Sequence, residues 1–479
     1  MKPFNRRTFL SSAGLGAVTH LVGCGATNTL TQADYRYPRK YIYRDDPDYA
    51  RWRDGMAWQQ HKHARFADVI ARPQNETDVI DAMAYARRHA LKVVVRCGGH
   101  NVSGAFYREG GMLLDLSMFR SVSIDVEEKS AWVGVAIWSR NLALQLAQAG
   151  FAFPYAHCAT VPMGGYLLGG GVGINGDSWG GIACANILAA EVVLADGRQI
   201  TVSPNENPDL YWAVRGAGTG FPGVVLRYKL KLYAAPQHVA SSSYIFPVDA
   251  AGEAADWLSH VRDAPPDDLE LMMLMAHTPD GPVAIVRYVA FTDSQTAAIK
   301  RLDKVHAHPM AGRAMAVMRN VPGSIEQGFI ESVDATRGLG FGSYGVETTW
   351  TDTLADSVSA TVEHFKAAIS PQTHMLISPR VHTELPARAA FSRIGKSFLG
   401  AYTVWDRAAS PDRENFAWLQ ETTQLMARYA TGRYINETNG FMDRERVLSS
   451  FTPDAFEGIE RLRRLYDPQG RFFGFPGYS

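Results

Sequence analysis

Nine glycines lie in the segment YAHCATVPMGGYLLGGGVGINGDSWGG, which runs from Tyr155 to Gly181. Large apolar residues such as Leu167 and Val172 alternate with these glycines, so the segment is predicted to be buried and not a flexible linker. Glycine allows positive φ and a close approach of backbone to a ligand, at an entropic cost that needs a reason. We therefore interpret the segment as the wall of a site for a large, flat, charged cofactor that faces main-chain N–H groups.

The composition of the whole chain is that of an ordinary globular protein. Its 479 residues are 46% apolar and 20% charged, and 48 basic residues balance 48 acidic ones. This length suits two or three domains. Because the chain has neither a net positive charge nor a basic cluster, nucleic acid is not expected as a partner. We find no internal repeat, and no metal site is predicted.

The first 24 residues read as an export signal. Arg6 and Arg7 form the arginine pair of a twin-arginine signal, and a short apolar stretch follows at 10–22. Leu21-Val22-Gly23-Cys24 resembles a lipobox, which predicts a lipid on Cys24 as the protein's contact with a membrane. The expected location is therefore periplasmic or membrane-anchored. The alternative is a plain cleavable signal with a chance cysteine.

The region 66–235 is predicted to be one mixed α/β domain, preceded by a tether and irregular segment at 25–65. Asn75 is placed to cap a helix, and Asn207 to cap another that starts at Pro208. Asp196-Gly197 supplies the turn of a hairpin between 187–194 and 199–202. Further strands are expected at 66–70, 92–96, 112–116, 122–124, 131–135 and 223–232, and a helix at 138–149.

Two further regions follow. Residues 236–430 alternate strands (269–276, 283–290, 399–404) with helices (294–305, 355–368), which predicts an antiparallel sheet with helices on one face. Residues 431–479 are expected to return to the first domain, with a short strand at 433–436, a helix at 453–465 and a tail rich in glycine and phenylalanine. The predicted fold class is α+β.

Three motifs carry a family resemblance. They are R-C-G-G-H at 96–100, C-A-T-V-P-M-G-G at 158–165, and D-L-Y-W-A-V-R-G at 209–216 with G-V-V at 223–225. Together they resemble the berberine bridge enzyme-like flavoproteins of the vanillyl-alcohol oxidase superfamily, which have a two-part PCMH-type FAD-binding domain and a separate substrate domain. The resemblance is good over 66–232, moderate over 431–479 and loose in between.

The resemblance implies a bound FAD with two covalent attachments. By position, His100 is bonded to the flavin 8α-methyl group and Cys158 to flavin C6. The same motifs imply a set of cofactor-binding residues, namely Arg96, Gly98, Gly99, Asn101, Val161, Gly164, Gly165, Gly169, Gly170 and Gly173. Valine at 161 is common among oxidases of the family, which implies that O2 accepts the electrons. Tyr166 replaces a histidine of the family.

The four cysteines support part of this interpretation. If Cys24 carries lipid, three remain, so at least one cannot pair within the chain. Attachment of Cys158 to flavin would account for the odd count. A disulfide between Cys97 and Cys184 is an alternative that the sequence does not exclude.

The catalytic base is predicted in the C-terminal region. The family carries Y-x-N-Y there, whereas this chain reads Tyr434-Ile435-Asn436-Glu437. Glu437 could act as the base if its environment raised its pKa, or it could be a surface carboxylate. Tyr434 could act in catalysis or simply pack. Tyr402 and His382 of the middle region are two further, less favoured candidates for the catalytic base.

These observations predict an exported FAD-dependent oxidase. It would oxidise an alcohol or similar C–H centre of a bulky small molecule by hydride transfer to flavin N5, with O2 reduced to H2O2. The substrate could be an oligosaccharide end, a phenolic or an alkaloid-like molecule. Trp350, Tyr402 and Trp405 could stack on it, and the alternative is that they are simple core residues. The alternatives are a dehydrogenase with another electron acceptor, a ligand-binding lipoprotein without turnover, and a nicotinamide enzyme built on the glycines at 169–173.

Overall fold

A computed structural model describes residues 40–263, 269–330, 342–380, 384–441 and 443–477. The predicted signal at 1–24 and the candidate His382 lie outside these residues. No helix in the described ranges combines the length and apolar character needed to span a membrane.

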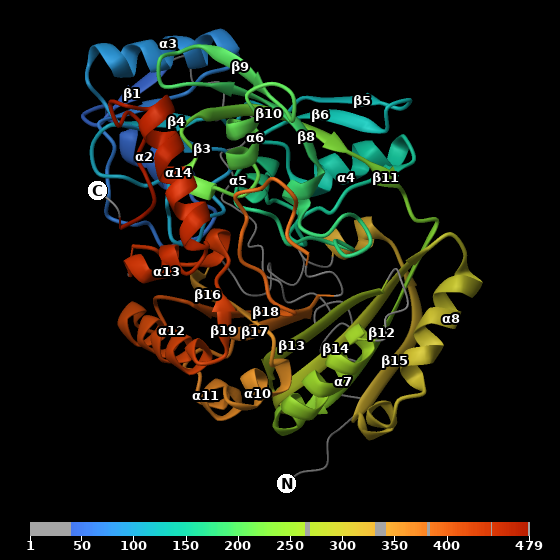
Figure 1. Ribbon diagram of the computed structural model, residues 1–479. Coiled ribbons are helices and arrows are strands. Elements are labelled where there is room, and N and C mark those ends of the chain that lie inside the picture. Colours follow the sequence, from blue (N-terminus) through green and yellow to red (C-terminus); the bar gives the residue numbers. More distant parts are fainter. Residues whose placement is uncertain (1–39, 264–268, 331–341, 381–383, 442, 478–479) are drawn as a thin grey trace.

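The cofactor-binding region contains two sheets that lie in the upper half of Figure 1. The first has the order β1-β2-β4-β3, and its strands β2, β4 and β3 run parallel. Its strands are β1 (Tyr41–Tyr43), β2 (Val69–Ala71), β3 (Val93–Arg96) and β4 (Met112–Asp115). Helix α3 (Glu76–Arg88) starts where predicted, because the Asn75 side chain accepts a hydrogen bond from the Asp78 N–H.

The second sheet is antiparallel and has the order β5-β6-β10-β8-β9. Its strands are β5 (Val122–Asp125), β6 (Ser130–Gly134), β8 (Ile187–Val193), β9 (Gln199–Val202) and β10 (Val224–Lys231), and β8 and β9 form the predicted hairpin. Beside it lie the pair β7 (Phe151–Ala152) and β11 (Tyr233–Ala234), the helices α4 (Ser139–Gln148), α5 (Met163–Leu168) and α6 (Pro208–Val214), and the short turns η2 (Ala183–Asn186) and η3 (Gly218–Gly220).

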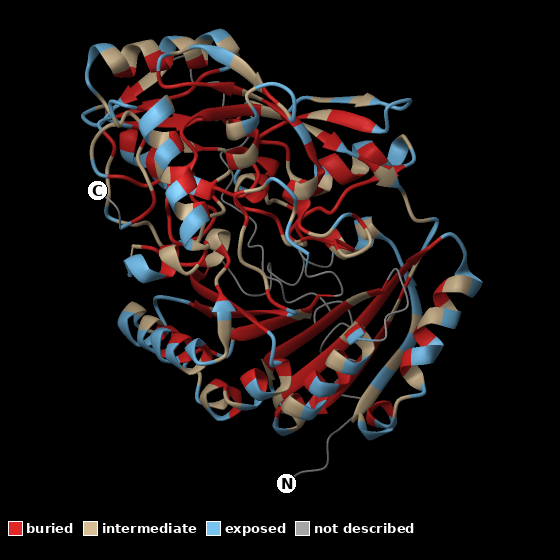
Figure 2. Cartoon of the chain, in the orientation of Figure 1, coloured by how far each residue is buried: buried red, intermediate tan, exposed pale blue. Residues whose placement is uncertain are grey.

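One antiparallel sheet of eight strands forms the second half of the molecule, with the order β15-β12-β14-β13-β17-β18-β16-β19. The strands are β12 (His238–Pro247), β13 (Leu269–Thr278), β14 (Gly281–Thr292), β15 (Ala316–Gly323), β16 (Ser343–Thr351), β17 (His374–Pro379), β18 (Ser397–Trp405) and β19 (Ala430–Gly432). We call it the large sheet. Figure 2 shows that its central strands are buried.

Helices cover one face of the large sheet, and the cofactor-binding region lies over the other face (Figure 1). The covering helices are α7 (Ala251–Asp263), α8 (Gln295–His306), α10 (Leu354–Ser359), α11 (Val362–Lys366) and α12 (Asp412–Ala427), with the turns η4 (Val248–Ala250) and η5 (Pro309–Arg313). The chain then returns to the first region through α13 (Arg444–Leu448) and α14 (Pro453–Tyr466). This arrangement confirms the predicted α+β class with an antiparallel sheet flanked by helices.

Several local predictions were wrong. The region before residue 66 is not wholly irregular, because β1 and α2 (Tyr49–Gly55) form there. The predicted helix at 355–368 is two short helices. The side chain of Asn207 does not cap α6; it donates to the Thr201 carbonyl instead.

The predicted strand at 433–436 is a turn, η6 (Ile435–Glu437). Pairing between β16 and β19 ends at Gly432. Beyond that residue, hydrogen bonds to the Thr348 side chain replace the backbone hydrogen bonds between the strands. The Thr348 hydroxyl accepts the Tyr434 N–H at 3.3 Å and donates to the Glu437 carbonyl at 3.1 Å. The chain therefore leaves the sheet and turns toward the cavity described next.

Candidate functional site

A cavity of about 310 Å³ lies between the cofactor-binding region and the large sheet. One wall comes from β3 and the loop after it, from 156–172, from η3 and from the tail at 472–474. We call this the cofactor wall. The opposite wall comes from β13, β17 and β18 of the large sheet, and we call it the sheet wall. The segment 434–437 lies at the boundary between them.

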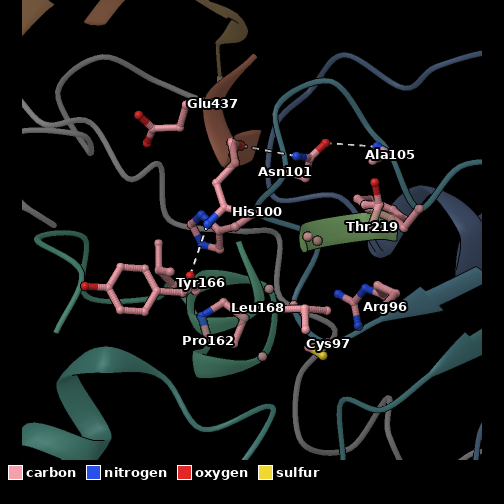
Figure 3. Close-up of a pocket in the computed structure, with 18 of the residues that line it drawn as sticks. Arg96, Cys97, His100, Asn101, Ala105, Pro162, Tyr166, Leu168, Thr219 and Glu437 are labelled. Atoms are coloured by element: carbon pink, nitrogen blue, oxygen red, sulfur yellow. Dashed lines mark hydrogen bonds between the residues drawn. The ribbon is translucent and has the colours of Figure 1, made fainter. Parts of the chain in front are cut away.

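His100 lies on the loop that follows β3 and lines the cavity (Figure 3). Its Nε2 forms a hydrogen bond of 2.9 Å with the Thr160 hydroxyl. Burial, with a smaller contribution from the charge of Arg96, lowers the pKa of His100 to about 3. The imidazole is therefore neutral at physiological pH, which is the form that can act as a nucleophile.

Gly99 makes this loop possible. Its φ is +71°, and a Cβ atom there would lie 1.8 Å from the carbonyl oxygen of Met56. Only glycine combines that backbone conformation with so close a contact between chain segments. The preceding Gly98 is also in close contact, since a Cβ atom there would lie 2.6 Å from Cγ of Pro162.

Cys158 lies beside the same threonine. Its sulfur is 3.6 Å from the Thr160 hydroxyl oxygen, so one hydroxyl contacts both predicted attachment residues. Cys158 is disulfide-bonded. Cys97 and Cys184 are free thiols, so the disulfide considered between them does not form.

The cofactor wall is built mostly from main chain and from side chains that already have partners. Arg96 lines the cavity, while its guanidinium binds Asp115 at 2.6 Å and the Met56 carbonyl at 2.8 Å. Gly165 faces open space, since a Cβ there would meet no atom within 4 Å. Asn101, Val161 and Gly164 also lie in the lining, as expected.

The C-terminal tail completes this wall. The Phe473 N–H donates to the Val93 carbonyl at 3.0 Å, and the Arg471 carbonyl accepts the Val93 N–H at 2.7 Å, so the tail runs beside β3. Phe472, Phe473 and Gly474 then line the cavity, together with Arg108, whose guanidinium holds the Gly474 carbonyl at 2.7 Å. Sequence reasoning missed these lining residues, although the unusual composition of the tail was visible.

Gly169, Gly170 and Gly173 were expected to bind cofactor, but they lie behind the lining and not in it. A Cβ on Gly169 would lie 2.0 Å from the Asn436 carboxamide oxygen, and one on Gly170 would lie 2.7 Å from the Phe391 ring. These glycines make room for neighbouring side chains. The arrangement gives no support to the nicotinamide alternative, because that alternative requires these glycines to contact the pyrophosphate of the cofactor.

Tyr434 and Asn436 fasten the segment 434–437 to this glycine tract. The Tyr434 hydroxyl accepts the Gly171 N–H at 2.9 Å and the Asn436 Nδ2–H at 2.9 Å. Asn436 also donates to the Tyr166 carbonyl at 3.1 Å, and its own carbonyl accepts from Asn101 at 3.3 Å. Burial raises the pKa of Tyr434 far above physiological pH. Both residues line the cavity, and these hydrogen bonds use the Tyr434 hydroxyl oxygen, the Asn436 side-chain N–H groups and the Asn436 carbonyl.

Glu437 points a carboxylate into the cavity region next to Tyr402 of β18, as the lining places both residues there. The Tyr402 hydroxyl donates to Glu437 Oε2 at 2.8 Å. Burial raises the pKa of Glu437, and the hydrogen bond from Tyr402 and the charge of His157 only partly oppose that effect. A carboxylate with a raised pKa and a hydrogen-bonded hydroxyl is suited to accept a proton from a substrate.

A buried cluster fixes the position of Glu437. Glu347 of β16 is 0% exposed, and its carboxylate accepts the Thr438 hydroxyl at 2.9 Å and the Asn439 N–H at 3.1 Å. Arg433 (3.3 Å) and Arg446 form ion pairs with the same carboxylate. The residues on both sides of Glu437 are therefore tied to β16 of the large sheet.

The rest of the sheet wall is mainly apolar. Met272, Leu376 and Phe398 lie in the lining. The Ser378 hydroxyl also lies there, but it donates a hydrogen bond to the Leu271 carbonyl at 3.3 Å. Trp350 and Trp405, which were candidates for stacking on a substrate, are core residues outside the lining. Few free hydrogen-bonding groups therefore face the cavity from the described strands.

His157 joins the two walls. It lines the cavity next to Cys158, and its Nε2 lies 2.5 Å from the carboxylate of Glu270 on β13. Burial acts to raise the pKa of Glu270, but the charge and hydrogen bond of His157, together with the charges of Arg287 and Arg380, outweigh it, so this pKa lies below its ordinary value. The sequence had given no signal for this pair, because its members are 113 residues apart.

Comparison with known proteins places these features in context. Residues 67–203 match the family model described as "FAD binding domain". The chain is 28% identical over 450 residues to (R)-6-hydroxynicotine oxidase of Paenarthrobacter nicotinovorans, covering 90% of this chain and 94% of that protein. It is 27% identical over 443 residues to the FAD-linked oxidoreductase janO of Penicillium janthinellum, covering 90% of this chain and 96% of that protein.

Solved structures share the fold along nearly the whole chain. The structure of 6-hydroxy-D-nicotine oxidase from Arthrobacter nicotinovorans has a TM-score of 0.79 at 23% identity, covering 91% of this chain and 96% of that one. The berberine bridge enzyme from Eschscholzia californica has a TM-score of 0.78 at 18% identity, covering 91% and 97%. A chitooligosaccharide oxidase has a TM-score of 0.77 at 18% identity, covering 90% and 95%.

Proposed function

We propose that this chain, an FAD-dependent oxidoreductase with the fold of the berberine bridge enzyme, oxidises an apolar alcohol or amine beside a covalently held flavin. The proposal depends above all on the pair formed by Glu437, at the boundary between the two walls, and Tyr402 of the sheet wall, both of which line the cavity. FAD, when bound, supplies the acceptor for the hydride that leaves the substrate carbon.

His100 is the proposed first attachment to FAD. Its neutral imidazole lines the cavity, and its hydrogen bond with Thr160 holds the ring in one orientation. Cys158 is the proposed second attachment. One sulfur cannot hold a disulfide and a thioether together, so the second attachment requires that the disulfide of Cys158 is reduced first. Mass spectrometry of denatured protein, with and without reductant, measures flavin at each residue.

Glu437 is the proposed general base, and its carboxylate takes the proton from the substrate hydroxyl or amine. Tyr402 orients that carboxylate through its hydrogen bond. Tyr434 and Asn436 are then positioning residues, because their polar groups hold the segment and not the substrate. The base therefore occupies the position at which this chain departs from the family's tyrosine.

The sheet wall favours an apolar or aromatic substrate over an oligosaccharide. A sugar needs many hydrogen-bonding partners, since buried polar groups without partners are costly. Met272, Leu376 and Phe398 offer none, and the Ser378 hydroxyl is already engaged. An alkaloid-like amine or a hydroxylated aromatic compound fits this lining better.

We propose O2 as the electron acceptor, with H2O2 as product, on the basis of Val161 in the lining and of its role in the family. A dehydrogenase with another acceptor is the alternative, and assays with dyes under anaerobic conditions separate the two. A ligand-binding lipoprotein without turnover would show no flavin reduction by any substrate.

We also propose export by the twin-arginine route, with a lipid on Cys24 or release into the periplasm. The pair of Arg6 and Arg7 ahead of a short apolar stretch supports this route. A lipid on Cys24 requires a free thiol there, as flavin attachment requires one on Cys158. Metabolic labelling with a palmitate analogue, in wild-type protein and in Cys24→Ala, tests the lipid.

The decisive experiment replaces the proposed base. Glu437→Gln keeps the shape of the side chain but cannot accept the proton, so we expect anaerobic flavin reduction to slow by about 10²- to 10⁴-fold. Flavin content should not change. Glu445→Gln, on an exposed carboxylate of α13, is the matched control and should behave as wild type. Reduction of the Glu437 variant at the wild-type rate would contradict the assignment.

A further inference from the structure

Trp58 packs directly behind His100. It lies between α2 and β2, in the region that the sequence had suggested was irregular. The indole and imidazole rings are stacked, with centroids 5.0 Å apart and an angle of 12° between planes. Trp58 is 6% exposed and does not line the cavity, so it covers the side of the imidazole that faces the protein interior.

Backbone contacts add to this stack. The Trp58 Nε1–H donates to the His100 carbonyl at 2.9 Å, and the Trp58 backbone N–H donates to the Gly99 carbonyl at 3.3 Å. One residue therefore holds the ring of His100, its carbonyl group and the glycine before it. Together with the hydrogen bond from Nε2 to Thr160, these contacts leave the imidazole little rotational freedom.

The neighbouring residues tie the same point to the large sheet. Gln59 donates to the Val102 carbonyl at 2.6 Å, and its side-chain oxygen accepts the Tyr344 N–H at 2.9 Å. The ring of Tyr344, on β16, lies 4.5 Å from the ring of Trp58. The segment 58–59 thus connects the loop of His100 with β16 of the large sheet.

We propose that Trp58 is a positioning residue for covalent flavin attachment, holding the His100 imidazole in the orientation that reacts. The inference rests on the attachment at His100 under the proposed function. Attachment forms a bond between a ring nitrogen of His100 and the flavin 8α carbon. Each partner loses one proton, and the two electrons that are released pass to O2, giving H2O2. Holding a nucleophile in one orientation accelerates such a step, because less entropy is lost on the way to the transition state.

A second stack in this protein provides the control. Trp418 of α12 stacks on His364 of α11, with centroids 5.1 Å apart and 7° between planes, and its Nε1–H donates to the His364 carbonyl at 3.0 Å. Trp418 is 5% exposed, close to the value for Trp58. Neither residue lines the cavity. The two tryptophans therefore share the ring stack on a histidine and the indole hydrogen bond to the carbonyl of that histidine, one behind the proposed attachment residue and one at a different histidine.

The experiment measures how fast FAD becomes covalent. Apoprotein made without flavin is incubated with FAD in air, and samples taken over time are denatured in acid to separate bound from released flavin. Total FAD bound before denaturation is measured in parallel. We expect Trp58→Leu to slow attachment at least tenfold and Trp58→Phe about threefold, with total FAD binding retained. Trp418→Leu should attach FAD at the wild-type rate.

The outcomes are distinct. If Trp58→Leu binds FAD and attaches it at the wild-type rate, the positioning role is wrong while the proposed function stands. If Trp58→Leu does not fold, Trp58→Phe decides, and an unchanged rate in that variant overturns the role. If wild-type protein releases all of its FAD in acid, attachment at His100 is itself wrong. Equal slowing in the Trp58 and Trp418 variants would show a general loss of stability and would also overturn the role.

Discussion

The two walls of the cavity are built on different principles. The cofactor wall depends on backbone, with chain segments so close at Gly99 that a single Cβ would meet a carbonyl oxygen at 1.8 Å. The sheet wall depends on side chains, which alternate along β17 and β18 between the cavity and the helix-covered core. A substitution in the first wall should therefore affect folding and FAD binding, and one in the second should affect substrate selection.

The largest effect is expected at Gly99. Gly99→Ala adds a methyl group against the Met56 carbonyl, where backbone cannot yield cheaply, so we expect no soluble protein that contains flavin. Gly110→Ala is the matched control. Gly110 has the same φ of +71°, but its Cβ would meet only Asp68 Oδ2, at 3.5 Å. It should fold and bind FAD, with a loss of about 1–2 kcal/mol for the left-handed conformation alone. Flavin absorbance and thermal melting measure both variants.

The next largest effect is expected in the buried cluster of Glu347, Arg433 and Arg446, which lies near the boundary between the walls. Glu347→Gln leaves the guanidinium groups of Arg433 and Arg446 buried without their counter-charge, so we expect a loss of about 3–5 kcal/mol in the free energy of unfolding. In the folded fraction, the segment that holds Glu437 should lose its fixed position, and flavin reduction should slow.

Glu253→Gln is the control for this cluster, since it removes an exposed ion pair with Arg313. It should leave the denaturation midpoint unchanged, because exposed pairs contribute little. A Glu347 variant as stable as wild type would mean that the cluster does not hold the segment, and the boundary between the walls would need another explanation.

The sequence predicted the cofactor wall far better than the sheet wall. Glycine carries positional information when backbone contacts are tight, and the loop of Gly98, Gly99 and His100 lies in the lining as its motif indicated. Gly169 and Gly170 show the limit of that reasoning. A glycine can make room for a neighbouring side chain as well as for a ligand, and only the fold distinguishes the two.

The sheet wall was beyond prediction for a physical reason. Met272, Leu376 and Phe398 look like any residues of a buried strand, because each strand alternates between two buried faces. Which face borders the cavity depends on the packing of the whole sheet. Likewise, Trp58 and the pair of His157 and Glu270 are formed by contacts across long stretches of chain.

A smaller effect is expected from the hydroxyl of Tyr402. Its hydrogen bond stabilises the charged form of Glu437 and so lowers a pKa that burial has raised. Tyr402→Phe removes that bond, which raises the pKa further. Since the base must be deprotonated, the rising limb of flavin reduction against pH should move to higher pH. The rate at pH 7 should fall about tenfold, because a hydrogen bond to a charged group contributes at least about 1.5 kcal/mol.

Tyr288→Phe is the control for this change, because the Tyr288 hydroxyl is buried with no partner among the described residues. Its pH profile should match that of wild type. A Tyr402 variant whose profile falls in height without shifting along the pH axis would show that the hydroxyl contacts substrate and does not tune Glu437.

The smallest effect separates the two faces of a single strand. Leu376 lines the cavity, whereas Ile377, next on β17, packs in the core under the helices. Leu376→Val removes one methylene from the substrate side, so kcat/KM for an apolar substrate should fall about fourfold, from about 0.8 kcal/mol per buried methylene. Ile377→Val removes the same group from the core and should cost about 0.5–1.5 kcal/mol of stability with kcat/KM unchanged. If both variants lose stability and neither changes kcat/KM, the substrate does not contact β17. The sheet wall would then select substrates through β13 and β18 alone.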